Sequence, residues 1–273
     1  MIKKKVFQDI PRYQINEDEL HFGQHEGRVI VRDPITKTTI LEKWNKVILP
    51  GSFYTLQKHF PGIKLPVQLP NYNKELDLDN TVALTPEEKL NEIVVLFAMG
   101  TDGCGPEGSQ IYDVDYTKWI DKDHLIPFRY CISDNDLNDE LRGKYFGRKE
   151  LKELDRVAYF FKAFDADPIC KSIYMDGTPV DENVYTSENK QKVRTYVELA
   201  MSVNKYDFRD YFEATIGINN CEVNTISLLT AYPKTIDGYT VYQDIQPLTK
   251  LNFSNESLRD LTKGIDITYQ IYY

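Results

Sequence analysis

The chain has 273 residues and carries 33 Lys and Arg residues against 42 Asp and Glu residues, a formal net charge of −9. A generic nucleic-acid-binding protein has a basic excess, so this balance argues against sequence-independent DNA or RNA binding. The longest apolar run, residues 93–99, has the length of a strand, and no stretch approaches the ~20 residues of a membrane span. No apolar stretch follows Lys3–Lys5 either, so we expect no secretory leader.

The first 27 residues are polar and irregular, which predicts an extended N-terminal arm. Residues 28–273 then form a single β-rich domain, with a sub-boundary near residues 133–150 as an alternative. The domain begins with a predicted hairpin, because residues 28–32 and 38–44 are rich in β-branched side chains and flank a turn that begins with Asp and Pro.

A helix is predicted next. Ser52 can cap it, and Phe53, Leu56 and Phe60 fall on one face at spacings of three and four. Pro and Gly follow at once and end it. The rest of residues 61–80 is rich in Pro and Asn and predicts a long loop, which is a second candidate arm.

Thr85 and Glu88 have the spacing of a capping box, which predicts a short helix. It leads into a strand over residues 93–99, whose apolar side chains on both faces favour a central position in a sheet. A strand over residues 125–132 follows. The stretch 134–148 is charged and predicts a loop.

Residues 156–164 predict an aromatic-rich strand, although residues 149–163 also fit a helix. Residues 206–212 predict a short amphipathic helix. Further strands are predicted at residues 169–175, 196–203, 225–231, 239–242 and 251–253. Strands at these short spacings, with few long helices between them, predict a mainly β fold with an antiparallel sandwich or barrel-like core.

The C-terminal segment has the clearest pattern in the chain. Every odd position from 265 to 273 is β-branched or aromatic, while the even positions are Asp, Thr, Gln and Tyr. This period of two predicts a half-buried strand that continues to the C-terminus. We place Tyr269 in the core on this basis.

Two motifs suggest ligand chemistry, and each has a simpler explanation. Residues 103–108 spell a literal Gly-x-Gly-x-x-Gly, but Pro106 and Glu107 lie inside it and a strand-like pattern follows. A dinucleotide site needs a helix there, so we interpret the segment as a flexible surface loop. Residues 134–139 resemble the start of a calcium loop without its Gly and its Glu, which favours a solvated acidic loop. We therefore assign no cofactor and no metal.

Neither the cysteines nor the aromatic residues form a catalytic pattern. The four cysteines, at positions 104, 131, 170 and 221, lie far apart and are expected to be reduced thiols. The chain has 19 Tyr and 13 Phe residues, a composition suited to buried sheet interfaces and partner contacts. The candidate interface residues are Trp44, Trp119, Tyr272 and Tyr273.

Several passages together resemble virion structural proteins of tailed bacteriophages. They are residues 42–52 after the hairpin, residues 100–105, residues 125–130, and the tail formed by residues 251–253 and 265–273. Their order is similar to that in neck, tail or baseplate components. The resemblance implies a non-enzymatic building block that forms a ring or sleeve with copies of itself and other virion proteins. It also implies that the protein is located in the virion after assembly in the host cytoplasm, and it identifies no catalytic residues.

Two other functions stay open. One is a carbohydrate- or receptor-binding β-sandwich, with Trp44 and Trp119 as the first candidate rings. The other is a hydrolase whose paired carboxylates meet only in three dimensions. For the virion subunit, an acidic surface could line a passage in which DNA slides without being bound.

Overall fold

The computed structural model describes residues 26–60, 64–65, 68–105, 110–114, 117–174, 178–180, 193–217, 222–253 and 264–272. Over these residues the chain is mainly β, as the sequence predicted, and every strand pair is antiparallel. The strands are β1 (Glu26–Arg32), β2 (Thr39–Val47), β3 (Ile93–Gly100), β4 (Leu125–Ile126), β5 (Arg129–Ile132), β6 (Tyr145–Leu151), β7 (Arg156–Ala163), β8 (Ile169–Tyr174), β9 (Val193–Val203), β10 (Thr225–Ile236), β11 (Tyr239–Pro247), β12 (Thr249–Asn252) and β13 (Ile265–Tyr272).

The helices are short. The α-helices are α1 (Leu49–His59), α2 (Tyr72–Glu75), α3 (Asp139–Arg142) and α4 (Arg209–Thr215), and the 3₁₀ helices are η1 (Glu88–Leu90), η3 (Lys122–His124), η4 (Ser133–Asn135) and η5 (Lys152–Leu154). None of the helices in the described part of the chain is long and apolar enough to cross a membrane.

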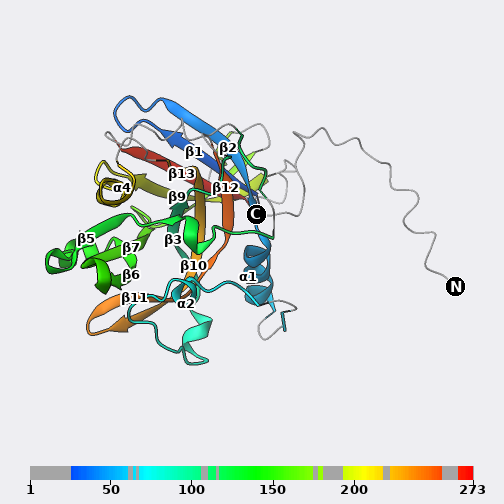
Figure 1. Cartoon of the computed structure of the whole chain (residues 1–273). Coiled ribbons are helices and arrows are strands. Elements are labelled where there is room, and N and C mark those ends of the chain that lie inside the picture. The colour runs from blue at the N-terminus through cyan, green and yellow to red at the C-terminus, as the bar shows by residue number, and fades with distance from the viewer. Residues whose placement is uncertain are drawn as a thin grey trace.

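The strands form two sheets that share one short strand. Sheet A has the order β8-β9-β13-β1-β2, and sheet B contains β5, β6, β7, β3, β4, β10 and β11. Strand β12 pairs with β10 of sheet B and with β2 of sheet A, so it joins the two. Figure 1 shows β1, β2 and β13 together in the upper part of the molecule, with β6, β7 and β11 below.

The main core lies between the two sheets. The odd residues of β13 face into it, as predicted: Ile265, Ile267, Tyr269 and Ile271 are at most 5% exposed. Tyr269 also donates a hydrogen bond to the hydroxyl of Thr249 at 2.7 Å. The hydroxyl of this buried ring is therefore satisfied, as buried polar groups require.

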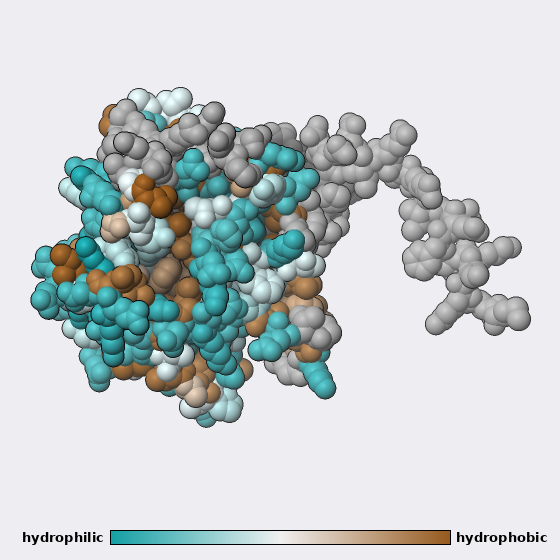
Figure 2. All heavy atoms as spheres, viewed as in Figure 1, coloured by the Kyte–Doolittle hydropathy of each residue, from teal (hydrophilic) through white to brown (hydrophobic). Residues whose placement is uncertain are grey.

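A second core covers the other face of sheet B. Leu96 of β3 and Leu229 of β10 pack there with Tyr72 of α2, and all three are fully buried. Sheet B curls around this core, so that Phe146 on β6 meets Tyr242 on β11 with ring centroids 4.7 Å apart. The face seen in Figure 2 is mostly hydrophilic, with hydrophobic residues in small separate patches.

Several helical predictions need correction. Helix α1 begins earlier than predicted, with Ile48 rather than Ser52 as its N-cap, and two of its predicted apolar-face residues, Leu56 and Phe60, are exposed. Residues 61–80 are not simply a loop or arm, because α2 lies within them and Tyr72 is fully buried in the second core. The capping box is confirmed: the Glu88 amide donates to the Thr85 hydroxyl, and the Thr85 amide donates to the Glu88 carboxylate.

Two strand or loop predictions also change. Residues 125–132 form two short strands, β4 and β5, interrupted at Pro127 and Phe128. The charged stretch 134–148 contains α3 and the start of β6. Residues 156–163 form a strand, which confirms the prediction over its helical alternative, whereas helix α4 starts three residues later than predicted. Of the predicted arm 1–27, residues 1–25 lie outside the described residues, and the last two belong to β1.

Candidate functional site

The outer face of sheet A carries a row of aromatic rings supported by arginines. Trp44 on β2 is 52% exposed, and its ring centroid lies 5.4 Å from that of Tyr272 on β13. Tyr272 in turn lies 5.0 Å from Tyr196 on β9. The guanidinium groups of Arg28 and Arg194 lie 6.0 and 5.8 Å from the Trp44 ring centroid. We call these five residues the Trp44 patch.

An ion pair holds Arg28 in this patch, and aromatic contacts hold Arg194. The Arg28 guanidinium donates two hydrogen bonds to one carboxylate oxygen of Glu42, at 3.1 and 2.5 Å. Partial burial lowers the pKa of Arg28, but the interactions with Glu42 and Tyr272 together outweigh it and leave the pKa above its usual value. Arg194 lies over Tyr272 at 4.4 Å. The ring quadrupole attracts guanidinium groups that lie over aromatic faces. The Trp44 side chain is therefore restrained by contacts with the arginines and with Tyr272.

The structure brings two of the predicted interface residues together and separates a third. Trp44 and Tyr272 share the patch, but Tyr272 is only 5% exposed and serves as a support for Trp44. Trp119 is half-buried and packs against the second core, away from the patch. Tyr273 lies outside the described residues.

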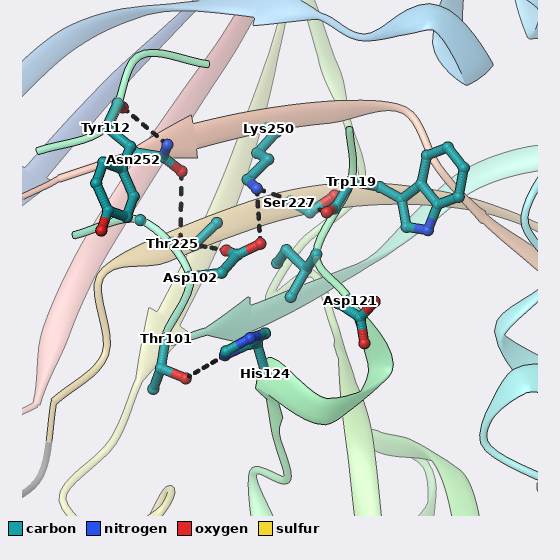
Figure 3. Close-up of polar contacts among 12 residues, drawn as sticks. Thr101, Asp102, Tyr112, Trp119, Asp121, His124, Thr225, Ser227, Lys250 and Asn252 are labelled. Carbon is teal, nitrogen blue, oxygen red and sulfur yellow. Dashed lines mark hydrogen bonds and ion pairs between the residues drawn. The ribbon is translucent and has the colours of Figure 1, made fainter. Parts of the chain in front are cut away.

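A buried polar cluster lies beside Trp119, where β10 and β12 meet the loop after β3. Lys250 donates to Asp102 at 2.7 Å, and Asp102 accepts a second bond from the hydroxyl of Thr225 at 2.9 Å. Asn252 donates to the carbonyl of Tyr112 at 2.9 Å. Figure 3 shows these groups converging, while the Trp119 ring points away from them.

This cluster holds the glycine-rich loop in place. The amide of Gly103 donates to the side chain of Asn224 at 2.7 Å, and an added Cβ at Gly103 would lie 2.2 Å from the Asn224 carbonyl oxygen. Residues 103–105 are buried, so the interpretation as a flexible surface loop is wrong for them. Residues 106–109 lie outside the described residues. The pocket next to the cluster measures about 520 Å³, and its Lys250 and Asp102 are already paired with each other.

A different pocket of about 590 Å³ lies between β6, α3 and the turn that joins β10 to β11. Asp136 lines this pocket and is the shared acceptor of a hydrogen-bond network. It accepts hydrogen bonds from Arg148 at 3.1 Å, Arg142 at 3.2 Å and the hydroxyl of Tyr159 at 2.7 Å. Arg148 also pairs with Asp79. We call this the Asp136 pocket. The predicted solvated acidic loop is therefore partly an ion-pair network at Asp136, whose side chain is 14% exposed.

The pKa of the Asp136 carboxyl is lowered, so this group is ionised at neutral pH. Burial raises the pKa of Asp136, but the bonds from Tyr159, the Leu137 amide and Arg148 outweigh it and leave the pKa below its usual value. A glycoside hydrolase needs one carboxylic acid with a raised pKa as proton donor. Two carboxyls whose pKa is raised, first of all by burial, are Glu92 and Asp165, and neither lines this pocket. The arrangement at Asp136 suits binding rather than proton transfer.

Sequence reasoning did not identify the Asp136 pocket. Its members come from segments more than 100 residues apart in the chain, such as Asp136 and Tyr239. The only signal was the acidic run 134–139, and its partners could not be predicted from spacing. In the described part of the chain, no group of three His, Cys, Asp or Glu side chains is placed to hold a metal ion.

No family model, curated protein or solved structure in the comparisons matches this chain.

Proposed function

We propose that this protein is a structural subunit of a multi-subunit particle, of the kind found in the neck, tail or baseplate of tailed-bacteriophage virions, and that it has no enzymatic role. The Trp44 patch is its contact with a neighbouring subunit. The observation that supports this proposal most strongly is a tryptophan that is half-exposed and yet held by a tilted neighbouring tyrosine ring and two guanidinium groups.

The chemistry of the patch is that of an interface hot spot. Trp, Tyr and Arg are the residues that contribute most to binding at protein interfaces, and they cluster at the centre of a contact. Isolated exposed apolar residues are common and need no explanation. Trp44 differs from them because its neighbours restrict the side chain before any partner arrives, which lowers the entropy cost of association.

The rest of the fold is consistent with a building block. The sheets are joined through β12, and the outer face of sheet A presents Trp44 from a paired strand rather than from a loop. The net charge of −9 opposes tight DNA binding, so in this proposal DNA passes near the protein without being gripped. The partners are copies of this chain and other particle proteins.

The proposal is tested by measuring the mass of the protein alone and of the complex that contains it in its native source. A tagged copy is recovered from the source under mild conditions, and the complex is measured by native mass spectrometry. We expect a fixed integer number of copies in a large, defined particle. Recovery of the chain only as a free monomer, or in variable substoichiometric amounts, contradicts the proposal.

A further inference from the structure

The Asp136 pocket combines aromatic rings with fixed polar groups and is independent of the Trp44 patch. Phe146 and Tyr242 form part of its wall in an edge-to-face contact, and Tyr239 stands at the turn that joins β10 to β11. Tyr239 is 45% exposed, and the Arg142 guanidinium lies 6.0 Å from its ring centroid. A pocket of about 590 Å³ lies within the size range of small-ligand sites.

The polar groups of the pocket are planar and restrained. Arg148 is bound to two carboxylates, Asp79 and Asp136, so its guanidinium plane is fixed. Arg142 uses one terminal nitrogen to reach Asp136, while its Nε is buried and has no acceptor in the described part of the chain. A guanidinium has five N–H donors, so the two arginines keep donors beyond those used in the ion pairs. Donors held in this way are preorganised for a ligand.

The charges of the wall are largely paired with one another. Asp79 and Asp136 are bound to the arginines, and Asp139 accepts a hydrogen bond from the Tyr239 hydroxyl at 3.1 Å. An anionic ligand would meet these carboxylates, and a cationic ligand would meet the two guanidinium groups. A neutral ligand with many hydroxyl groups is repelled by neither set of charges. Its hydroxyls can accept hydrogen bonds from arginine and donate them to carboxylates.

We propose that the Asp136 pocket binds a neutral sugar residue, with its C–H face against Tyr239 and its hydroxyl groups bound by Arg142, Arg148 and the carboxylates beside them. This site lies outside the proposed subunit contact, so either assignment can fail without the other.

Saturation-transfer NMR tests the assignment with the full chain and four probes, namely glucose, galactose, mannose and N-acetylglucosamine. Each is used at about 10 mM, ten times a millimolar Kd. We expect transfer to at least one sugar, with binding weakened at least about tenfold in Tyr239→Ala and in Arg142→Ala. Tyr239→Phe keeps the ring but loses the hydroxyl bond to Asp139, so it should weaken binding less than Tyr239→Ala does. Tyr206→Ala, which removes an exposed tyrosine elsewhere, is the matched control.

Three outcomes overturn the assignment. The first is the absence of transfer to all four sugars. The second is binding that is equal in the wild type and in Tyr239→Ala. The third is displacement of the sugar by millimolar inorganic phosphate, which would mark an anion site at the arginines. Circular dichroism checks that each variant is folded, and because Tyr239 stands at an exposed turn we expect its variants to fold normally.

Discussion

The ammonium nitrogen of Lys162 lies 2.8 Å from a carboxylate oxygen of Asp207, and their side chains are 5% and 0% exposed. The pair connects the two sheets. Lys162 belongs to β7 of sheet B and also donates to the carbonyl of Ser202 on β9 of sheet A at 2.7 Å. Asp207 accepts further hydrogen bonds from the Tyr145 hydroxyl and from the backbone amide of Asn204. Every charge at this junction therefore has partners.

Removing one member of this pair should destabilise the protein strongly. Asp207→Ala leaves a buried ammonium without its counter-charge, and we expect a loss of about 3–5 kcal/mol in the free energy of unfolding, measured in urea. Adding Lys162→Met to Asp207→Ala removes the unpaired charge and should recover part of the loss. If Asp207→Ala costs less than about 1 kcal/mol, the pair is not buried as described.

Two glycines with positive φ allow steric clash to be separated from backbone strain. Gly147 has a φ of 67°, and an added Cβ would lie 2.4 Å from the ring of the fully buried Phe161. Gly238 has a φ of 84°, with no atom within 4 Å of an added Cβ. We expect Gly238→Ala to cost about 1–2 kcal/mol from strain alone, and Gly147→Ala to cost about 1–3 kcal/mol more. Equal thermal shifts for the two variants would argue against the packing of β6 on Phe161.

The lowered pKa of Asp136 predicts an acid-dependent contribution to stability. A carboxyl whose pKa is lower in the folded state stabilises the fold above its unfolded pKa, and this contribution is lost as the pH falls through the folded value. Asp136→Asn removes it. The gap in unfolding free energy between wild type and Asp136→Asn should be largest near neutral pH and should shrink below about pH 4. A gap that is constant with pH would contradict the ion-pair network at Asp136.

The contribution of Glu92 to stability should change with pH in the opposite direction to that of Asp136. Burial raises its pKa, although bonds from Thr230 and Tyr232 oppose the shift. The folded state then binds more protons than the unfolded state between the two pKa values, so stability falls as the pH rises through that window, which begins at about pH 4. Glu92→Gln should remove this slope in denaturant titrations at a series of pH values. A wild type without such a slope would show that Glu92 is not desolvated.

The sequence was most informative where local pattern and tertiary position agree. The odd residues of 265–271 are buried because β13 lies inside sheet A, between β1 and β9, with one face on the core. The capping box at Thr85 is a local hydrogen-bond pattern and needs no tertiary context. Both could therefore be predicted from neighbouring residues alone.

Prediction failed where polar residues have tertiary partners. Residues 145–148 of strand β6 fall in the charged stretch 134–148, which the sequence predicts to be a loop. In the fold, Arg148 is paired with Asp79 and Asp136, so its charge is accommodated in a strand. The Asp136 pocket was missed for the same reason, since its residues meet only through the topology. The Trp44 patch was predicted in part: Trp44 and Tyr272 were named, but Tyr196 and the two arginines were not.

The central claim is that Trp44 contacts a neighbouring subunit, and a competition experiment tests it most directly. Trp44→Ala and Tyr206→Ala remove rings of equal exposure, 52% each, from different surfaces. Each variant is co-expressed with tagged wild-type protein in the native source, and its share of the assembled particle is measured by mass spectrometry. The account predicts that Tyr206→Ala enters the particle as well as wild type does, whereas Trp44→Ala is depleted at least about tenfold, equivalent to about 1.4 kcal/mol. Equal incorporation of the two variants would contradict it.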